Sequence, residues 1–206
     1  MKVVALLWLA TANGAVLPDA ALAQQTLRWL DKVVIAHNLC PFAAASRMAT
    51  KAVVCGEVGD PAMTVLQEEV KLLRAVELDA RATTLLILPA YHDFATMMEF
   101  RDEAEDALAK ADGDHDTADN RPIQLLAFHP DAAFEDQPDP ADFSLRSPHP
   151  MIHLLRDSDV EGAEASWALR HHPEEPPSIQ ERNAAYLRGL GVDAVSKALR
   201  EALEEQ

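Results

Sequence analysis

The run Thr83-Thr-Leu-Leu-Ile-Leu88 constrains the fold of this 206-residue chain more than any other segment. It is β-branched at its start, continuously apolar afterwards, and followed by Pro89, which predicts a short strand. A strand that is apolar on both faces must be covered by other elements on both sides of its sheet. The run therefore predicts a layered α/β arrangement in which helices supply that cover.

Sequence patterns on both sides of this run alternate between helix and strand. Asp60-Pro61 opens one helix, because aspartate is a preferred N-cap and proline is tolerated at the first helical position. Ser158-Asp-Val-Glu161 and Ser178-Ile-Gln-Glu181 both match the capping box at the start of a helix. Further helices are expected near Asp19, Phe94 and Asp193, and further strands over 51–58 and 122–128. We predict an α/β fold: a single layered domain with a small mixed sheet of three to four strands packed with five to six helices.

The charge of the chain excludes some classes of partner. Lysine and arginine number 18 and aspartate and glutamate number 34, which gives a formal net charge of −16. Such a charge repels phosphate backbones and anionic lipid headgroups. We therefore expect no nucleic acid and no membrane surface among the partners of this soluble, acidic chain.

Residues 1–14 have the parts of a secretory signal segment. Lys2 precedes the apolar run Val3–Ala10, and small residues follow over Thr11–Gly14. The apolar run is too short to span a bilayer. The alternative is an ordinary apolar first element. A cleaved signal implies a secreted or organellar protein and an ordinary element a cytoplasmic one; residues 15–206 form the single domain in either case.

The segment Phe128–His153 contains the features most typical of a functional site. It holds His129, His149, His153 and Arg146 among several prolines. Prolines restrict a loop to few conformations, and loops held by a rigid scaffold carry many binding and catalytic residues. The sequence therefore predicts a site in this segment.

His129 is the leading candidate in that site. It directly follows an expected strand, where catalytic and ligating groups are often found, and Asp131 can orient its imidazole. We expect it to act as an acid, a base or a metal ligand, with His153 as the second metal ligand. The alternative is a turn in which Asp131 caps local amides. His149 is a weaker candidate, because the prolines around it prevent a helical HExxH arrangement.

Arg146 and Cys40 complete the predicted catalytic set. The two-pronged donor face of Arg146 suits a carboxylate or phosphate, and Ser147 beside it is a candidate substrate-binding residue. Arg146 is equally able to pair with an acidic side chain and fix the loop. Cys40, before Pro41, is a candidate nucleophile, redox thiol or soft ligand to haem iron. Its alternative role is that of a small buried hydrophobe.

Four ordered segments resemble the blocks of a known family. They are Asn38-Leu-Cys-Pro-Phe-Ala43, Phe128-His-Pro130, Arg146-Ser-Pro-His-Pro150 with His153-Leu-Leu-Arg156, and Glu181-Arg-Asn183. On these segments the chain resembles the family catalogued as domain of unknown function 1415, from about Asp19 to Gly191. It departs from the family pattern at Leu145 and at His149, where relatives carry an aromatic ring. The resemblance implies relatives but no activity.

The last of these segments adds two candidate residues. The capping box explains Glu181, so we assign no catalytic role to that carboxylate. Arg182 and Asn183 are not explained by the cap, and we expect them to reach the site as substrate-binding residues from the first helical turn.

Three functional hypotheses follow. The first is a small-molecule enzyme, such as a haem- or metal-dependent oxidoreductase, with a His/Arg/Cys-lined pocket for an anionic substrate. The second is a cofactor-free enzyme in which a histidine deprotonates Cys40 for attack on an electrophile. The third is a non-catalytic binding or assembly protein whose proline-rich segment docks a partner. The patterns leave open the oligomeric state and whether Cys40 and Cys55 pair.

Overall fold

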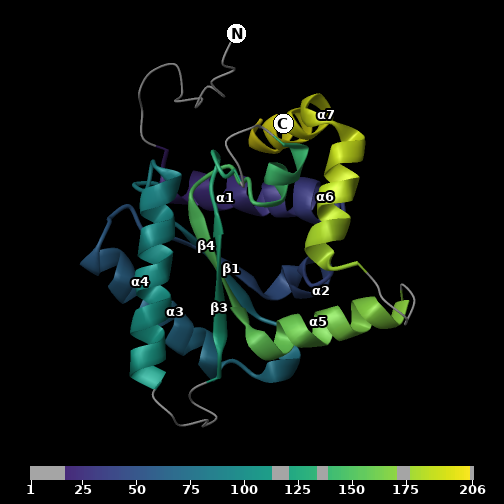
Figure 1. The fold of residues 1–206 in the computed structure, drawn as a ribbon. Helices are drawn as coiled ribbons and strands as arrows, with labels where there is room; N and C mark the ends of the chain where they lie inside the picture. Colours follow the sequence, from purple (N-terminus) through teal and green to yellow (C-terminus); the bar gives the residue numbers. More distant parts are fainter. Residues whose placement is uncertain (1–16, 113–120, 134–138, 171–176, 205–206) are drawn as a thin grey trace.

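A computed structural model describes residues 17–112, 121–133, 139–170 and 177–204 (Figure 1). The segment 1–14, for which the sequence predicts a signal or an apolar first element, lies outside these residues.

A four-stranded mixed sheet forms the centre of the described domain. Its strands are β1 (Thr50–Val54), β2 (Thr83–Ile87), β3 (Ile123–Phe128) and β4 (Met151–Arg156). Their order across the sheet is β1-β2-β4-β3; β1 and β2 are parallel, and β4 is antiparallel to both of its neighbours. Every residue of the two central strands, β2 and β4, is buried. The predicted mixed sheet and the burial of the run that begins at Thr83 are thus confirmed.

Helices cover both faces of this sheet (Figure 1). On one face, α3 (Asp60–Ala75) and α4 (Phe94–Asp112) contribute side chains such as Leu66 and Met97 to a core shared with Leu86 of β2. The other face is covered by α1, its continuation as a π-helix, α6 and α7. These elements span Asp19–Trp29, Leu30–Ile35 (η1), Ile179–Leu190 and Val192–Leu203. The result is a three-layer α/β/α domain.

One further α-helix of 14 residues (α5) and several short elements complete the described chain. They are α2 (Ala43–Ser46), α5 (Asp157–Arg170) and the 3₁₀ helices η2 (Arg47–Ala49), η3 (Leu78–Ala80) and η5 (Pro140–Ser144). The described residues therefore contain seven α-helices, against five to six expected, because the sequence did not predict the one-turn α2.

The predicted helix starts are correct in part. The capping box at Ser178 is confirmed: Ser178 Oγ accepts from the Glu181 N–H (3.1 Å), and the Glu181 carboxylate accepts from the Ser178 N–H (2.8 Å). The box at Ser158 is wrong, because α5 begins at Asp157 directly after β4. The helix expected near Asp193 is present as α7, and its N-cap is Gly191, with φ of 80°, rather than Asp193.

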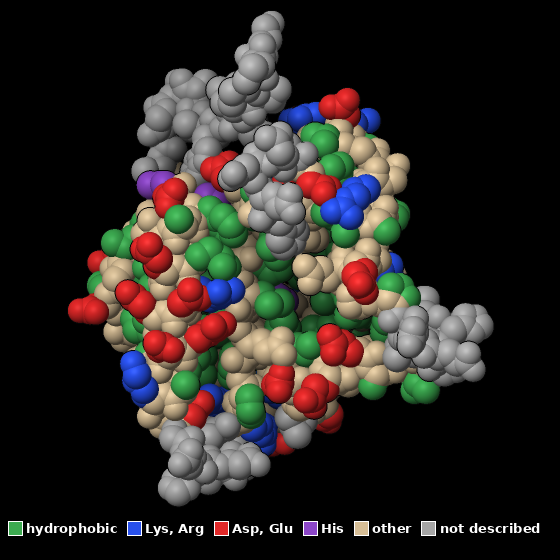
Figure 2. Space-filling view, in the orientation of Figure 1, with side chains coloured by type: hydrophobic (Ala, Val, Ile, Leu, Met, Phe, Trp, Pro, Cys, Tyr) green, Lys and Arg blue, Asp and Glu red, His purple; other side chains and the backbone are tan. Residues whose placement is uncertain are grey.

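The surface agrees with the composition. Acidic side chains are spread widely over the face in Figure 2, as expected for a net charge of −16. Within the described ranges, no helix combines the length and the apolar character needed to cross a membrane.

Candidate functional site

Cys40 lies in a tight turn between η1 and α2. Asn38 adopts a left-handed conformation (φ 51°), and the Leu39 N–H donates back to the Val34 carbonyl (2.8 Å). Asparagine tolerates this conformation better than most residues. The chain thereby reverses before Pro41 and leaves the Cys40 thiol half-buried. Cys40 and Cys55 are both free thiols.

Helix α6 binds the backbone of this turn through the two residues that follow Glu181. Asn183 Nδ2 donates to the Leu39 carbonyl (2.7 Å), and its side chain is buried. The Arg182 guanidinium donates to the Asn38 carbonyl and to Asn183 Oδ1. Two segments separated by 144 positions in sequence are thus held together by side chain to backbone hydrogen bonds.

The Cys40 thiol and the Arg182 guanidinium interact electrostatically. Burial raises the pKa of Cys40, and the backbone N–H groups of Phe42 and Ala43 and the charge of Arg182 partly oppose that increase. Burial lowers the pKa of Arg182, opposed by Cys40 and Tyr186. The guanidinium is therefore close enough to act on both the thiol and the phenol.

Three aromatic or imidazole side chains complete this group. Arg182 stacks on the Trp167 ring of α5, with 4.7 Å between guanidinium carbon and ring centroid. His37 Nδ1 and the Tyr186 hydroxyl are 2.9 Å apart. We define the Cys40 site as Cys40, Arg182, Asn183, Trp167, His37 and Tyr186. The sequence patterns did not predict the last three; the four-residue spacing of Arg182 and Tyr186 on one helix was the available signal for Tyr186.

His129 lies at the end of β3, as expected, but its ring is enclosed. Its side chain is fully buried, Nε2 donates to the Tyr91 carbonyl (3.2 Å), and Nδ1 accepts from the Asp131 N–H (3.0 Å). Burial lowers the pKa of this imidazole. Both ring nitrogens are occupied by backbone groups, so a role as ligand or base requires one of these bonds to break.

Arg146 and Ser147 bond within the loop around them. Arg146 Nε donates to the Ala132 carbonyl (2.9 Å), its guanidinium stacks on Phe143, and one nitrogen lies 3.7 Å from the Asp142 carboxylate. Ser147 is fully buried, and its hydroxyl donates to the His149 carbonyl (2.6 Å). These contacts match the alternative in which Arg146 fixes the loop.

The remaining two histidines bind separate partners. His149 Nε2 donates to Gln25 Oε1 (2.8 Å). His153 Nε2 donates to the Thr83 hydroxyl (2.6 Å), which itself donates to the Leu154 carbonyl. Burial lowers the pKa of each imidazole to about 4. Among the residues described, no group of three or more His, Cys, Asp or Glu side chains is arranged to hold a metal ion.

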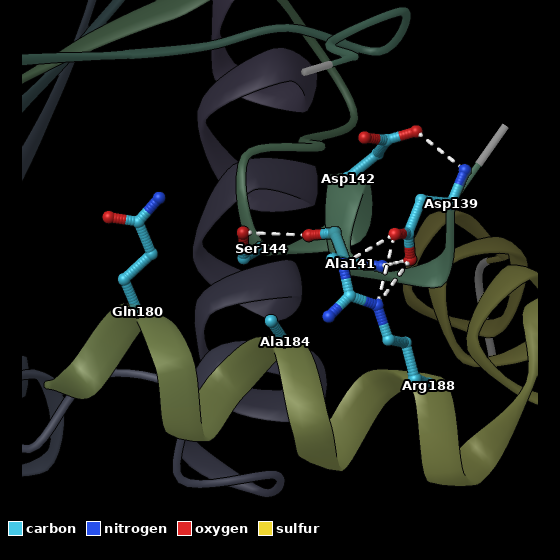
Figure 3. Close-up of a pocket in the computed structure, with 7 residues that line it drawn as sticks. All are labelled: Asp139, Ala141, Asp142, Ser144, Gln180, Ala184 and Arg188. Carbon is cyan, nitrogen blue, oxygen red and sulfur yellow. Dashed lines mark hydrogen bonds and ion pairs between the residues drawn. The ribbon is translucent and has the colours of Figure 1, made fainter. Parts of the chain in front are cut away.

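A cavity of about 250 Å³ lies against another face of α6, beside η5 (Figure 3). Its lining includes Asp142, Gln180 and Arg188, and an ion pair between Arg188 and Asp139 (2.6 Å) closes one side. Neither the residues of the Cys40 site nor the candidates of the histidine segment line this cavity. The cavity is therefore not the predicted His/Arg/Cys-lined pocket.

Comparison with known proteins identifies a family without an assigned activity. No curated protein and no solved structure matches the chain. A family model described as protein of unknown function (DUF1415) matches residues 21–197, which is most of the chain. That range includes the Cys40 turn, the histidine segment and α6. The chain therefore belongs to the DUF1415 family.

Proposed function

We propose that this protein is a cofactor-free enzyme in which the Cys40 thiol attacks a small anionic electrophile. One observation carries the proposal: of the predicted site residues, Cys40, Arg182 and Asn183 come together, and the thiol among them is half-buried rather than enclosed. A nucleophile must be reachable, and the adjacent guanidinium attracts an anionic substrate and partly offsets the burial that raises the pKa of the thiol.

The residues of the site have separate roles in this proposal. Cys40 gives up its proton to water, and its sulfur forms a bond to an electrophilic carbon; the leaving group departs with the bonding electrons and takes up a proton. Water then cleaves the new bond and restores the thiol. Arg182 attracts the anionic group of the substrate. Asn183 acts as a positioning residue, because it holds the backbone carbonyl next to Cys40.

The contacts of the other predicted site residues favour a cofactor-free enzyme over a haem- or metal-dependent one. His129, the leading ligand in that hypothesis, uses both ring nitrogens for backbone groups. His153, the second proposed ligand, donates to Thr83 of the neighbouring strand. Arg146, the proposed grip for an anionic substrate, is bonded to the loop that carries it.

Two alkylating probes of the same size test the proposal: anionic iodoacetate and neutral iodoacetamide. In a Cys55→Ser variant, which leaves Cys40 as the reporter, we expect the ratio of the iodoacetate rate to the iodoacetamide rate to exceed that of a free thiol. The net charge of −16 acts in the opposite direction, so a raised ratio reports a local cation. Mass spectrometry of the modified peptide assigns the site.

Variants of Arg182 supply the control. Arg182→Gln removes the charge and should lower the ratio to the free-thiol value or below it. Arg182→Lys keeps the charge and should retain most of the preference. A ratio that is unchanged in Arg182→Gln, or a Cys40 that neither probe reaches in the folded protein, would overturn the proposal.

A further inference from the structure

β3 is an edge strand without the usual protection of such an edge. It pairs with β4 on one side, and in the described part of the chain no backbone hydrogen bond joins its other side to another element. Alternate residues of an antiparallel strand direct their N–H and C=O groups away from the partner strand. Its sequence, Ile-Gln-Leu-Leu-Ala-Phe, contains no charge, glycine or proline, and Leu126 is 40% exposed.

The opposite edge of the sheet is protected. β1 carries Lys51, whose ammonium group binds the Glu69 carboxylate (2.6 Å) and whose side chain is half exposed. A lysine on an edge strand disfavours pairing with another strand, because pairing would bury its charge. The two edges of the sheet therefore differ in how readily they accept a further strand.

A groove of about 490 Å³ runs along the exposed edge. Five consecutive residues, 122–126, line it together with Leu108 and Ala109 of α4. The side chains of consecutive strand residues point to opposite faces of the sheet. A groove lined by all five of them therefore lies along the edge of β3 and not over one face. The groove therefore combines unpaired backbone with apolar side chains.

The charges around this groove balance, unlike those of the chain as a whole. Its lining contains Arg74, Arg101, Glu105 and Asp112, two cations and two anions, whereas the chain has a net charge of −16. Two copies of so acidic a chain repel each other over most of their surface. These charges pair within one chain, Arg74 with Asp112 (2.5 Å) and Arg101 with Glu105 (3.9 Å), so the patch carries no excess charge that would repel the same patch of a second copy across a two-fold axis.

We propose that two copies of this chain associate through antiparallel pairing of β3 with β3, which joins the two sheets across a two-fold axis. This assembly is independent of the function proposed for the Cys40 site. An interface built on one strand and one groove is at the small end of specific interfaces, so we expect a dissociation constant on the order of micromolar.

Sedimentation velocity of the full chain over a wide concentration range, combined with hydrogen exchange of the β3 amides, tests the proposal. We expect a monomer–dimer equilibrium in which protection of residues 123–128 increases with the dimer fraction. A monomer at all concentrations overturns the proposal. Protection that is independent of concentration also overturns it and indicates that another segment of the same chain covers the edge.

Substitutions locate the interface. Leu126→Lys should weaken dimerisation by about tenfold or more, because it places a charge on the paired strand. Leu190→Lys is the matched control: Leu190 is 38% exposed on α6 and should leave the equilibrium unchanged. Equal effects of the two variants would contradict an interface at β3.

A charge reversal provides a second test that does not alter the strand. Arg101→Glu makes the patch acidic and should weaken the dimer, and the double variant Arg101→Glu/Glu105→Arg should restore it. Both side chains are partly exposed on α4, so thermal unfolding of the monomer should change little. The proposed contact would be contradicted if Arg101→Glu left the dissociation constant of the dimer unchanged. It would also be contradicted if the double variant dimerised as weakly as Arg101→Glu alone.

Discussion

Asn183 links two distant segments through one buried side chain. Its Nδ2 donates to the Leu39 carbonyl (2.7 Å) next to Cys40. Asn183→Ala removes this donor and leaves a buried carbonyl without it, which we expect to lower the free energy of unfolding by about 1–3 kcal/mol. Urea denaturation measures the change. Gln180→Ala, at an exposed position of the same helix, is the control, and a loss no larger than that of the control would contradict a positioning role for Asn183.

The ionisation of Cys40 gives a prediction about pH. Burial raises its pKa, and the charge of Arg182 acts against that increase. In the Cys55→Ser protein, the rate of alkylation by iodoacetamide should therefore rise with pH to a midpoint above the ordinary thiol value of about 8.5. Arg182→Gln should move the midpoint higher still. A midpoint below the ordinary value, or one that Arg182→Gln lowers, would show that burial does not control this thiol.

At the residue scale, the sequence predicted that Cys40, Arg182 and Asn183 belong to a site, and it did not predict how His129 and Arg146 are bonded. The first three occur in segments that resemble family blocks, and the structure joins them. The last two bind the carbonyls of Tyr91 and Ala132. Any residue supplies a backbone carbonyl, so such partners leave no pattern in the sequence. An imidazole or guanidinium in a loop therefore looks the same whether it is free or bonded.

The start of α6 depends on its capping box. Ser178 and Glu181 satisfy each other's backbone N–H groups, and these bonds hold the pKa of the Glu181 carboxyl below its usual value. Ser178→Ala should destabilise the protein by about 1 kcal/mol in chemical denaturation. Ser166→Ala in α5 is the control, because that serine donates to the Gly162 carbonyl within its own helix and caps nothing. If both variants lose the same stability, the box does not stabilise α6.

The same start affects the Cys40 site, because Arg182 is in the first turn of α6. A first turn that frays releases the guanidinium from the Asn38 carbonyl. Ser178→Ala should therefore also reduce the preference of Cys40 for iodoacetate over iodoacetamide, although Ser178 is outside the site. If Ser178→Ala is less stable but Cys40 keeps its full preference for iodoacetate, the turn that contains Cys40 is sufficient to hold Arg182 in place.

At the element scale, the sequence predicted those elements whose stabilising contacts or burial can be read from neighbouring residues. The box at Ser178 and the apolar run of β2 are examples. β4 is the contrary case: it follows two prolines, contains His153 and Arg156, and nevertheless lies at the centre of the sheet with all its residues buried. Arg156 is accommodated because it binds Asp159 and the carbonyls of Val76 and Glu77. These partners become known only when the strands are placed, so the segment looked like part of a polar loop.

At the scale of the whole molecule, buried histidines couple folding to pH. His149 and His153 have pKa values lowered to about 4 by burial, and burial lowers the pKa of His129 as well. An unfolded imidazole binds a proton below about pH 6.5. Between pH 6.5 and 4 the unfolded state therefore holds more protons than the folded state, and stability decreases as the pH falls. For His153, which is buried in β4, the full difference corresponds to about 3 kcal/mol.

We therefore predict that the free energy of unfolding falls as the pH is lowered from 6.5 toward 5, a range in which most carboxylates stay ionised. The decrease should persist at high salt, because screening weakens repulsion among surface charges but not the cost of a buried imidazolium. His149→Phe replaces the titrating imidazole by an aromatic ring and leaves the half-buried Gln25 able to bind water. This substitution should reduce the dependence of the free energy of unfolding on pH, while the free energy of unfolding at neutral pH changes less. A slope unaltered in His149→Phe would contradict a contribution of His149, and stability that rises as the pH falls would show that relief of the repulsion within a chain of charge −16 outweighs the cost of the buried imidazoles.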